Sequence, residues 1–359
     1  MKCSLNHTAS ILAALCVLAV LAGCRKEAVV TRASVSFSVV PDVSGETKAA
    51  LSADGESRIG SLDLLMFRSG DGILDTHVRV DASGTESLTS LEASVTRGVE
   101  LRWYIVANAP AGLLSACELE EQFLGAVTTL EDMSGDVMVM HAGGVNVFGD
   151  EVNRIDGVLL VRYACKVTLQ SLRVSWLGTF DVPPSCTLDK VALVNVRGDG
   201  RYSGVLSAAE DDLWYNRSSI DAHSPFIDRC ILWEGSLPIS GPESVDVGIS
   251  LYAMPNPSEG DGVGPVISSN PWTPRRTRLV LGLTIEDIFQ WYPVDLPAMV
   301  EKTHYVAENV IIMGPGTPGP DEGIDRTSID FTVNVYGWGE YDHGEYVFPT
   351  VESMEPEAP

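Results

Sequence analysis

The chain has 359 residues, of which 45% are apolar and 20% are charged, and its formal net charge is −25. This apolar fraction is typical of a globular protein and excludes disordered and collagen-like architectures, while the length allows about two domains of ~150 residues each. The excess of negative charge repels phosphate backbones and argues against a nucleic-acid partner. The 33 Gly and 20 Pro favour many short strands joined by tight turns over a helical bundle.

The N-terminal residues are typical of an export signal. Ile11–Ala22 is an apolar run that is too short to span a bilayer at ~1.5 Å per residue. It ends in the sequence Leu-Ala-Gly-Cys at 21–24, the pattern of a bacterial lipobox, in which the thiol of Cys24 accepts the acyl chain. We therefore predict a lipoprotein signal peptide over residues 1–23 and a polar tether over 24–34. No Asp follows the lipid-bearing cysteine, so we expect passage to the outer membrane; an ordinary signal peptide with a chance cysteine is the alternative.

Alternating apolar and polar residues predict strands along the rest of the chain. Turn residues separate these stretches at intervals typical of a β-sandwich, so the predicted fold class is all-β with two tandem sandwich domains. The predicted strands are Val35–Val39, Ile59–Phe67, Leu101–Ala107, Val137–Met140, Val158–Leu169, Val191–Val196, Val245–Met254, Arg278–Leu283, Tyr305–Met313 and Ile329–Tyr336, with one short helix within Cys117–Thr129. A boundary near 153–157 divides the chain into domains over 35–155 and 156–359.

The four cysteines that follow Cys24 show no C-x-x-C spacing, which argues against a zinc site. They are Cys117, Cys165, Cys186 and Cys230. An exported protein meets an oxidising compartment, so disulfides are open to them, but free buried thiols are the default expectation.

Motifs for catalysis or cofactor binding are missing or incomplete. No two histidines lie four residues apart, and neither a G-x-S-x-G nor a P-loop pattern occurs. Gly314–Gly319 matches G-x-G-x-x-G by letter, but no helix is predicted after it, and its prolines remove backbone donors that a phosphate needs. We therefore predict no enzyme, no cofactor and no metal.

Three weaker motifs are accounted for by ordinary structure. The acidic residues Asp321, Glu322, Asp325 and Asp330 do not match a calcium-binding loop and are expected to be solvated. The tripeptide Arg197-Gly198-Asp199 could contact a receptor, but a turn after a strand accounts for it equally well. Aromatic residues near strand ends could stack on sugars, although they more often close a core. The aromatic residues in question are Trp272, Trp291 and Trp338.

A series of short motifs, in order along the chain, resembles the fimbrillin-like subunits of type V pili of Bacteroidales. These motifs are residues 33–40 (ASVSFSVV), 48–49 (KA), 55–67 (GESRIGSLDLLMF), 104–108 (YIVAN), 139–143 (VMHAG), 161–167 (VRYACKV), 291–296 (WYPVDL), 304–305 (HY), 314–316 (GPG) and 333–338 (VNVYGW). In 139–143, His141 and Ala142 depart from the family pattern. The resemblance covers residues 33–338 and follows a lipobox.

The resemblance implies two transthyretin-like sandwich domains and assembly by donor-strand exchange. The subunit would travel as a lipoprotein anchored in the outer membrane, and a trypsin-like protease would then cut the loop behind the first strand. In this chain the basic residue of that loop is Lys48, so the new N-terminus would be Ala49. Arg32 precedes the strand and Arg58 abuts the next one, so both would be poor substitutes.

The residues of the first strand fit a removable core element. Val35, Phe37 and Val39 lie on one face of it, and burial of three such side chains stabilises a fold by about 5–8 kcal/mol. Its loss would expose an apolar groove with an unpaired strand edge on each side, which a foreign strand could fill. Because the groove has one direction, such contacts are head-to-tail and build a filament.

The donor strand is less clearly indicated. Phe331, Val333 and Val335 alternate and are the candidate donor residues, although they could equally form a resident strand. The 21 residues beyond Trp338 contain further aromatic residues, but Pro349 limits the pairing they can make. The leading hypothesis is therefore a surface pilus subunit for cell adhesion, whose partners are other pilus subunits and a maturation protease. The alternative is a surface glycan-binding lipoprotein that does not polymerise.

Overall fold

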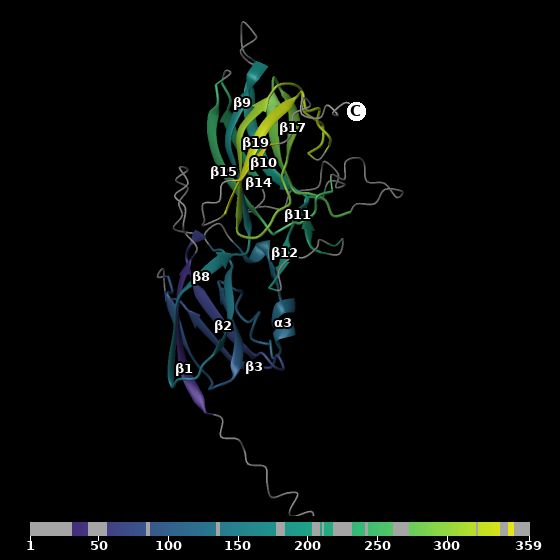
Figure 1. Ribbon diagram of the computed structural model, residues 1–359. Coiled ribbons are helices and arrows are strands. Elements are labelled where there is room, and N and C mark those ends of the chain that lie inside the picture. Colours follow the sequence, from purple (N-terminus) through teal and green to yellow (C-terminus); the bar gives the residue numbers. More distant parts are fainter. Residues whose placement is uncertain are drawn as a thin grey trace, which may run out of the picture.

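The computed structural model describes residues 31–41, 56–83, 87–133, 137–176, 184–202, 209, 212–217, 232–240, 243–260, 273–320, 322–337 and 344–347. These residues form two β-sandwich lobes stacked end to end, and the region where they meet is called the waist (Figure 1). Nearly all of the regular structure is strand, so the predicted all-β fold is confirmed. Among the described residues, no helix has the length and apolar character needed to cross a membrane.

The N-terminal lobe consists of seven paired strands that fold into two layers. Their order is β3-β2-β5-β7-β8-β1-β4. The layers, β4-β1-β8 and β3-β2-β5-β7, are joined where the first residues of β7 pair with the last residues of β8. The strands are β1 (Arg32–Pro41), β2 (Ser61–Arg68), β3 (Leu74–Asp81), β4 (Ser90–Thr96), β5 (Glu100–Ala107), β7 (Met140–Val147) and β8 (Val152–Arg162).

A buried apolar core lies between these two layers. Phe37 of β1 contacts Trp103 of β5 across it, with ring centroids 5.2 Å apart. β7 passes close to the same indole because Gly144 has no side chain; a Cβ there would lie 2.6 Å from the Trp103 ring. The indole Nε1 donates to Asn146 Oδ1 at 2.8 Å. The small residue in β7 therefore allows a large side chain to fill the core opposite β1.

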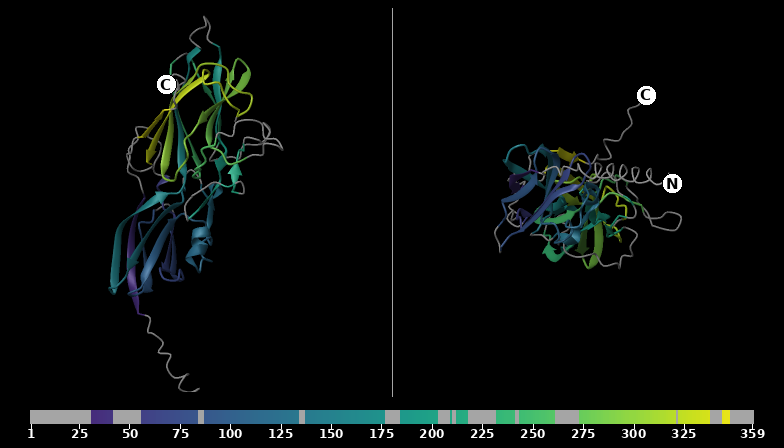
Figure 2. Two further views of the ribbon diagram at one scale, coloured as in Figure 1. Left: turned by 45° about the vertical axis from the view of Figure 1, so that its right-hand side comes forward. Right: turned by 90° about the horizontal axis from the view of Figure 1, so that it is seen from below.

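The outer face of β2 and β5 is covered by the short helix α3 (Glu120–Gly125) (Figure 2). Phe123 of α3 packs on Tyr104 at 4.6 Å and stacks on Tyr202 of the following lobe at 5.2 Å. Next to it, β6 (Val127–Thr129) pairs with β12 (Asp199–Arg201). A 3-10 helix, Leu130–Asp132, follows β6. The apolar core is thus continuous from the N-terminal lobe into the C-terminal lobe.

The C-terminal lobe is a second sandwich of two sheets, β15-β9-β18-β19-β20 and β14-β10-β16-β17. β9 and β18 are parallel neighbours, and the other pairs are antiparallel. The strands are β9 (Cys165–Val174), β10 (Cys186–Val194), β14 (Leu232–Pro238), β15 (Val245–Ala253), β16 (Arg278–Ile285), β17 (Ile288–Asp295), β18 (Thr303–Ile312), β19 (Ile329–Gly337) and β20 (Gly344–Val347), with the short pair β11 (Val196–Arg197) and β13 (Trp214–Tyr215) beside them.

Two details differ from the sequence-based expectations. The predicted strand Val158–Leu169 is two strands in different lobes, β8 and β9, separated by a bend at Tyr163 and Ala164. β8 pairs with β1 through the region of the predicted boundary, so the first sandwich extends to Arg162. The residues before and after the bend are buried, so the alternation of apolar residues continues through it. The sequence pattern therefore gave no sign that the chain turns there.

Several strands were not predicted because their residues are partly exposed and polar. In β3 all but the last residue are partly buried, and β14, in which no residue is fully buried, is more exposed still. β4, β17 and the full length of β7 also lay outside the predicted set, although β4 alternates exposed with buried residues and Trp291–Val294 of β17 are buried. Strands such as β3 and β14, by contrast, are defined by their pairing with neighbours rather than by their own apolar residues.

Candidate functional site: the seat of the first strand

β1 lies between two strands of its layer. It pairs antiparallel with β4 from Arg32↔Thr96 to Ser38↔Ser90, and parallel with β8 from Ser34↔Val152 to Pro41↔Leu160. Removal of β1 would therefore leave two unpaired strand edges facing each other. Unpaired edges of this kind readily accept another strand.

The inner face of β1 belongs entirely to the core. Val35 and Phe37 are fully buried, and Ala33 and Val39 are 3% exposed. The outer face carries Ser34, Ser36 and Ser38 and is partly or fully exposed. β1 is thus an amphipathic strand that fills the core with one face only, which is what a replaceable strand requires.

A bulge marks the parallel pairing of β1 with β8. Between Phe37 and Val39 the register shifts, so that Asp156 and Gly157 of β8 both lie opposite Ser38. Gly157 has φ +67°, a conformation that favours glycine. The N–H of Gly157 donates to Ser38 Oγ at 2.9 Å, and Ser38 Oγ lies 3.3 Å from Asp156 Oδ1. Sequence reasoning missed this bulge, although a glycine inside an apolar strand was its signal.

The upstream end of β1 is held by Arg32. Its guanidinium donates to Asp75 Oδ2 at 3.3 Å and to Thr96 Oγ1 at 3.2 Å, and it also reaches the side chain and the carbonyl of Ser94. Asp75 accepts in addition from the backbone N–H of Thr96 at 2.9 Å. Arg32 is thus tied to β3 and β4 by its side chain, and the expectation that a cut there would leave the strand in place stays a prediction.

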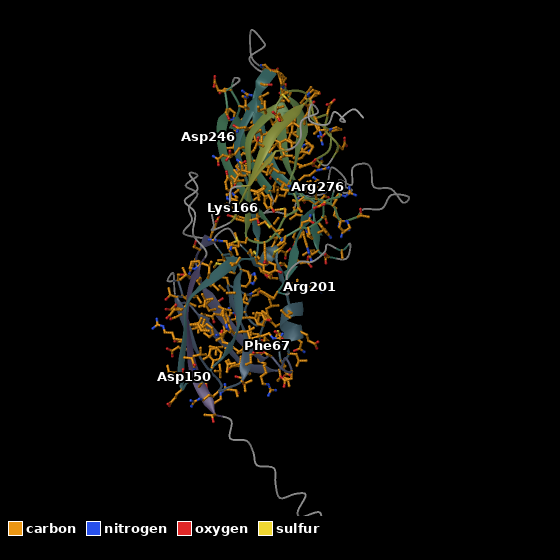
Figure 3. All side chains as sticks on the ribbon, in the orientation of Figure 1. Phe67, Asp150, Lys166, Arg201, Asp246 and Arg276 are labelled. Carbon is orange, nitrogen blue, oxygen red and sulfur yellow. The ribbon has the colours of Figure 1, made fainter. Side chains whose placement is uncertain are left out.

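The backbone that follows the predicted processing loop is fixed at the waist. The Glu56 carboxylate accepts from Lys166 Nζ of β9 at 2.7 Å and from the Tyr252 hydroxyl of β15. Arg162 donates to the Glu56 carbonyl at 3.3 Å and to Ser57 Oγ at 3.0 Å. Glu56, Lys166 and Tyr252 are all buried, and Figure 3 shows Lys166 at the junction of the lobes. No sequence pattern had indicated this cluster.

Arg58, the other basic residue considered for cleavage, lies in an irregular segment that is held by hydrogen bonds. Its carbonyl accepts from Asn108 Nδ2 at 2.8 Å, and the next N–H, that of Ile59, donates to Ser87 Oγ at 3.0 Å. Ile59 is buried in the core. A protease would have to pull this segment out of the fold before cutting it.

The candidate donor residues lie in β19. This strand pairs with β18 on one side and with β20 on the other. Val333 is fully buried, whereas Phe331 and Val335 are partly buried. In this conformation the residues form a resident strand of the C-terminal lobe, which is the second of the two expectations for this segment.

The remaining predicted site residues lie outside the described part of the chain. They are Cys24, Lys48 and Ala49, and the same holds for the signal peptide, most of the tether, Cys230, Trp272 and Trp338. Lipidation and proteolytic maturation at these residues stay predictions.

The weaker motifs are integrated into the fold. Arg197 is 4% exposed and forms ion pairs of 3.2 Å with Asp199 and with Asp212, so the Arg-Gly-Asp tripeptide is not presented to a receptor in this structure. Trp291 is 7% exposed and packs in a small apolar cluster with Val194 and Val280, and the more exposed Phe289 contacts its ring edge-on at 4.9 Å. No group of three or more His, Cys, Asp or Glu side chains among the described residues could hold a metal ion.

The three described cysteines are free and buried. Burial raises the pKa of each thiol above its ordinary value, and for Cys186 to about 11. A thiol with a raised pKa is mostly protonated and therefore unreactive at neutral pH. The cysteines are Cys117, Cys165 and Cys186.

Comparison with known proteins shows a similarity of the N-terminal lobe to one protein family. Residues 33–162, which run from β1 to the end of β8, match the family model of the major fimbrial subunit protein (FimA). The resemblance noted in the sequence is thereby confirmed. A sequence search of curated proteins gives no match.

Solved structures with a similar fold cover both lobes. A candidate cell adhesion protein from Bacteroides eggerthii aligns with a TM-score of 0.58 at 16% identity, over 86% of this chain and 96% of that one. A fimbrilin (FimA) from Porphyromonas gingivalis aligns with a TM-score of 0.55 at 15% identity, over 85% of this chain and 97% of that one. A candidate cell adhesion protein from Parabacteroides distasonis gives 0.58 at 13% identity, over 86% and 100%. At these identities the similarities establish the fold.

The N-terminal lobe is therefore similar to a fimbrial subunit protein, and the described chain as a whole has the fold of the solved proteins named above. The part of the chain that carries the family match is the sandwich built around β1.

Proposed function

We propose that the chain is a pilus subunit that is exported as a lipoprotein and polymerises when β1 is exchanged for a strand of a neighbouring subunit. The observation that carries this proposal is the position of β1, whose inner face fills the core between two strands that would both lose their partner. A donor strand that supplies similar side chains would restore both the apolar burial and the two hydrogen-bond ladders.

Maturation in this scheme depends on one cut. Acylation of Cys24 would hold the precursor at the outer membrane, and cleavage after Lys48 by a trypsin-like protease would separate β1 from the rest of the chain. The segment behind the cut would stay in place because Glu56 is fixed by Lys166 and Tyr252. Release of β1 would therefore open its groove without unravelling β2.

The proposed donor belongs to the C-terminal strands of the neighbour. β19 offers the alternating Phe331, Val333 and Val335, but it would have to leave both β18 and β20. Within the described residues β20 pairs only with β19, so it could detach more easily. Head-to-tail repetition of the contact would give a surface filament whose role is adhesion.

The N-terminus of the protein on cells tests the proposal. Mass spectrometry of the surface form should show a start at Ala49 for a shaft subunit, or an acylated Cys24 for an anchor subunit that keeps β1. The variant Lys48→Ala should stay monomeric and uncut, whereas Lys48→Arg, which a trypsin-like protease also accepts, should polymerise as before. A surface form with neither N-terminus, or polymers of Lys48→Ala that equal those of the natural chain, would contradict the scheme.

A further inference from the structure

The groove that β1 occupies is lined by apolar side chains and regular strand pairing, except for one polar contact at the bulge of β8. At the bulge of β8, the N–H of Gly157 points to β1 and finds its acceptor in a side chain, Ser38 Oγ, at 2.9 Å. The extra residue of a bulge leaves the regular ladder, so its backbone groups need partners from elsewhere. Gly157 lies at the exposed face of the strand, so water competes for its N–H, and a strand that supplies a side-chain acceptor at this one position is favoured over a strand that does not.

The neighbours of Ser38 make this position unique. The preceding residue, Phe37, fills the core against Trp103, and the following residue, Val39, is 3% exposed. Ser34 and Ser36 are hydroxyl residues as well, so a slide by two residues could still bring a hydroxyl group to Gly157. Such a slide would move Phe37 out of the space opposite Trp103, and the combination of aromatic and hydroxyl residue therefore defines one register.

We propose that Ser38 is the register-determining residue of β1, and that the groove prefers a strand that carries Ser or Thr between an aromatic residue and an aliphatic residue. This inference rests on the proposed strand exchange and specifies the chemistry of the partner strand. The ligand is an extended segment that runs parallel to β8, with its hydroxyl group accepting from Gly157 and close to Asp156.

The chain itself contains one other segment of this kind. An aromatic residue, a hydroxyl residue and an aliphatic residue follow one another at Phe37-Ser38-Val39 and again only at Phe331-Thr332-Val333. Ile329 and Asp330 precede the second triplet in the way that Val35 and Ser36 precede the first. The tail from Trp338 to Pro359 contains no such triplet, so this preference favours a β19-like strand over the tail as the donor.

Peptide exchange into the nicked full-length chain tests the preference. A specific protease site replaces residues 44–48, the chain is cut there with β1 still seated, and labelled peptides of residues 31–41 compete for the groove. The peptide with Ser38→Thr should compete about as well as the natural one, and the peptide with Ser38→Ala about 3- to 10-fold less well, because one backbone donor loses its acceptor. The matched control is Ser36→Ala, which removes a hydroxyl group on the same face that makes no side-chain hydrogen bond within the described part of the chain and should change nothing.

The outcomes separate this inference from the proposed function. Equal competition by the Ser38→Ala and natural peptides would overturn the inference and leave strand exchange intact. If even the natural peptide fails to enter, strand exchange is contradicted, and amide hydrogen exchange in the intact chain then decides the role of Ser38. In that measurement Ser38→Ala should reduce the protection of the Gly157 N–H while Ser36→Ala does not; unchanged protection would overturn the register role.

Discussion

Single residues decide the chemistry of the waist between the lobes. His304 of β18 is buried beside Lys166, and its Nε2 lies 2.8 Å from Thr168 Oγ1. Burial, and secondly the positive charge of Lys166, lower the pKa of His304 from 6.5 to about 3. The folded protein thus holds a neutral imidazole where the unfolded chain would be protonated below pH 6.5.

This difference makes stability depend on pH in a definite direction. As the pH falls from 6.5 towards 3, the unfolded chain binds a proton that the folded chain does not, so the free energy of unfolding decreases. The contribution of His304 is about 1.4 kcal/mol per pH unit within that window. The variant His304→Gln, which can still bond to Thr168, should lose this part of the slope. Urea unfolding at pH 7.5 and pH 5 measures it, and equal slopes for the two proteins would contradict the assignment.

At the scale of elements, β1 has a buried inner face and a partly exposed outer face. Phe37 is fully buried against Trp103, so Phe37→Ala leaves a cavity and should lower the free energy of unfolding by about 3–5 kcal/mol. Ser36→Ala changes the outer face and should alter it by less than about 0.5 kcal/mol. Denaturant unfolding of the uncut chain gives both values. Comparable values for the two variants would mean that β1 does not contribute to the core as the structure indicates.

At the scale of the whole molecule, one buried ion pair links the two lobes. Glu56 precedes β2 and Lys166 lies in β9, with 2.7 Å between Oε1 and Nζ. Lys166→Met leaves a buried carboxylate without its cation and should cost about 3–5 kcal/mol. The exposed pair of Lys190 and Glu234 is the matched control, because Lys190→Met should cost at most about 1 kcal/mol.

The double variant Glu56→Gln with Lys166→Met distinguishes a lost attraction from an unpaired charge. It removes both charges, so most of the stability lost in Lys166→Met should return. Thermal and urea unfolding of the three variants provide the comparison. If the double variant is no more stable than Lys166→Met, the loss of stability in Lys166→Met arises from lost packing of the lysine side chain rather than from the unpaired charge of Glu56.

Apolar alternation with a period of two was enough to predict the all-β class and most central strands. It identified β1 because Val35, Phe37 and Val39 each alternate with Ser, a pattern that is typical of a strand with one buried face. The short motifs around Tyr104 and Arg162 were also sufficient to indicate a resemblance to the fimbrial subunits, and residues 33–162 match the model of the FimA family. These features are local, and each is encoded in a few consecutive residues.

Contacts between segments that are distant in the sequence could not be predicted from such local patterns. That β1 lies between β4 and β8, that Ser38 meets the Gly157 bulge, and that Glu56 pairs with Lys166 follow from pairing across 50 to more than 100 residues. The bend between β8 and β9 could not be predicted for the same reason. The residues before and after it are buried, so the alternation along the sequence is not interrupted. Strand order, bulges and buried ion pairs depend on which surfaces meet in three dimensions, and alternation along one strand records only which of its faces is buried.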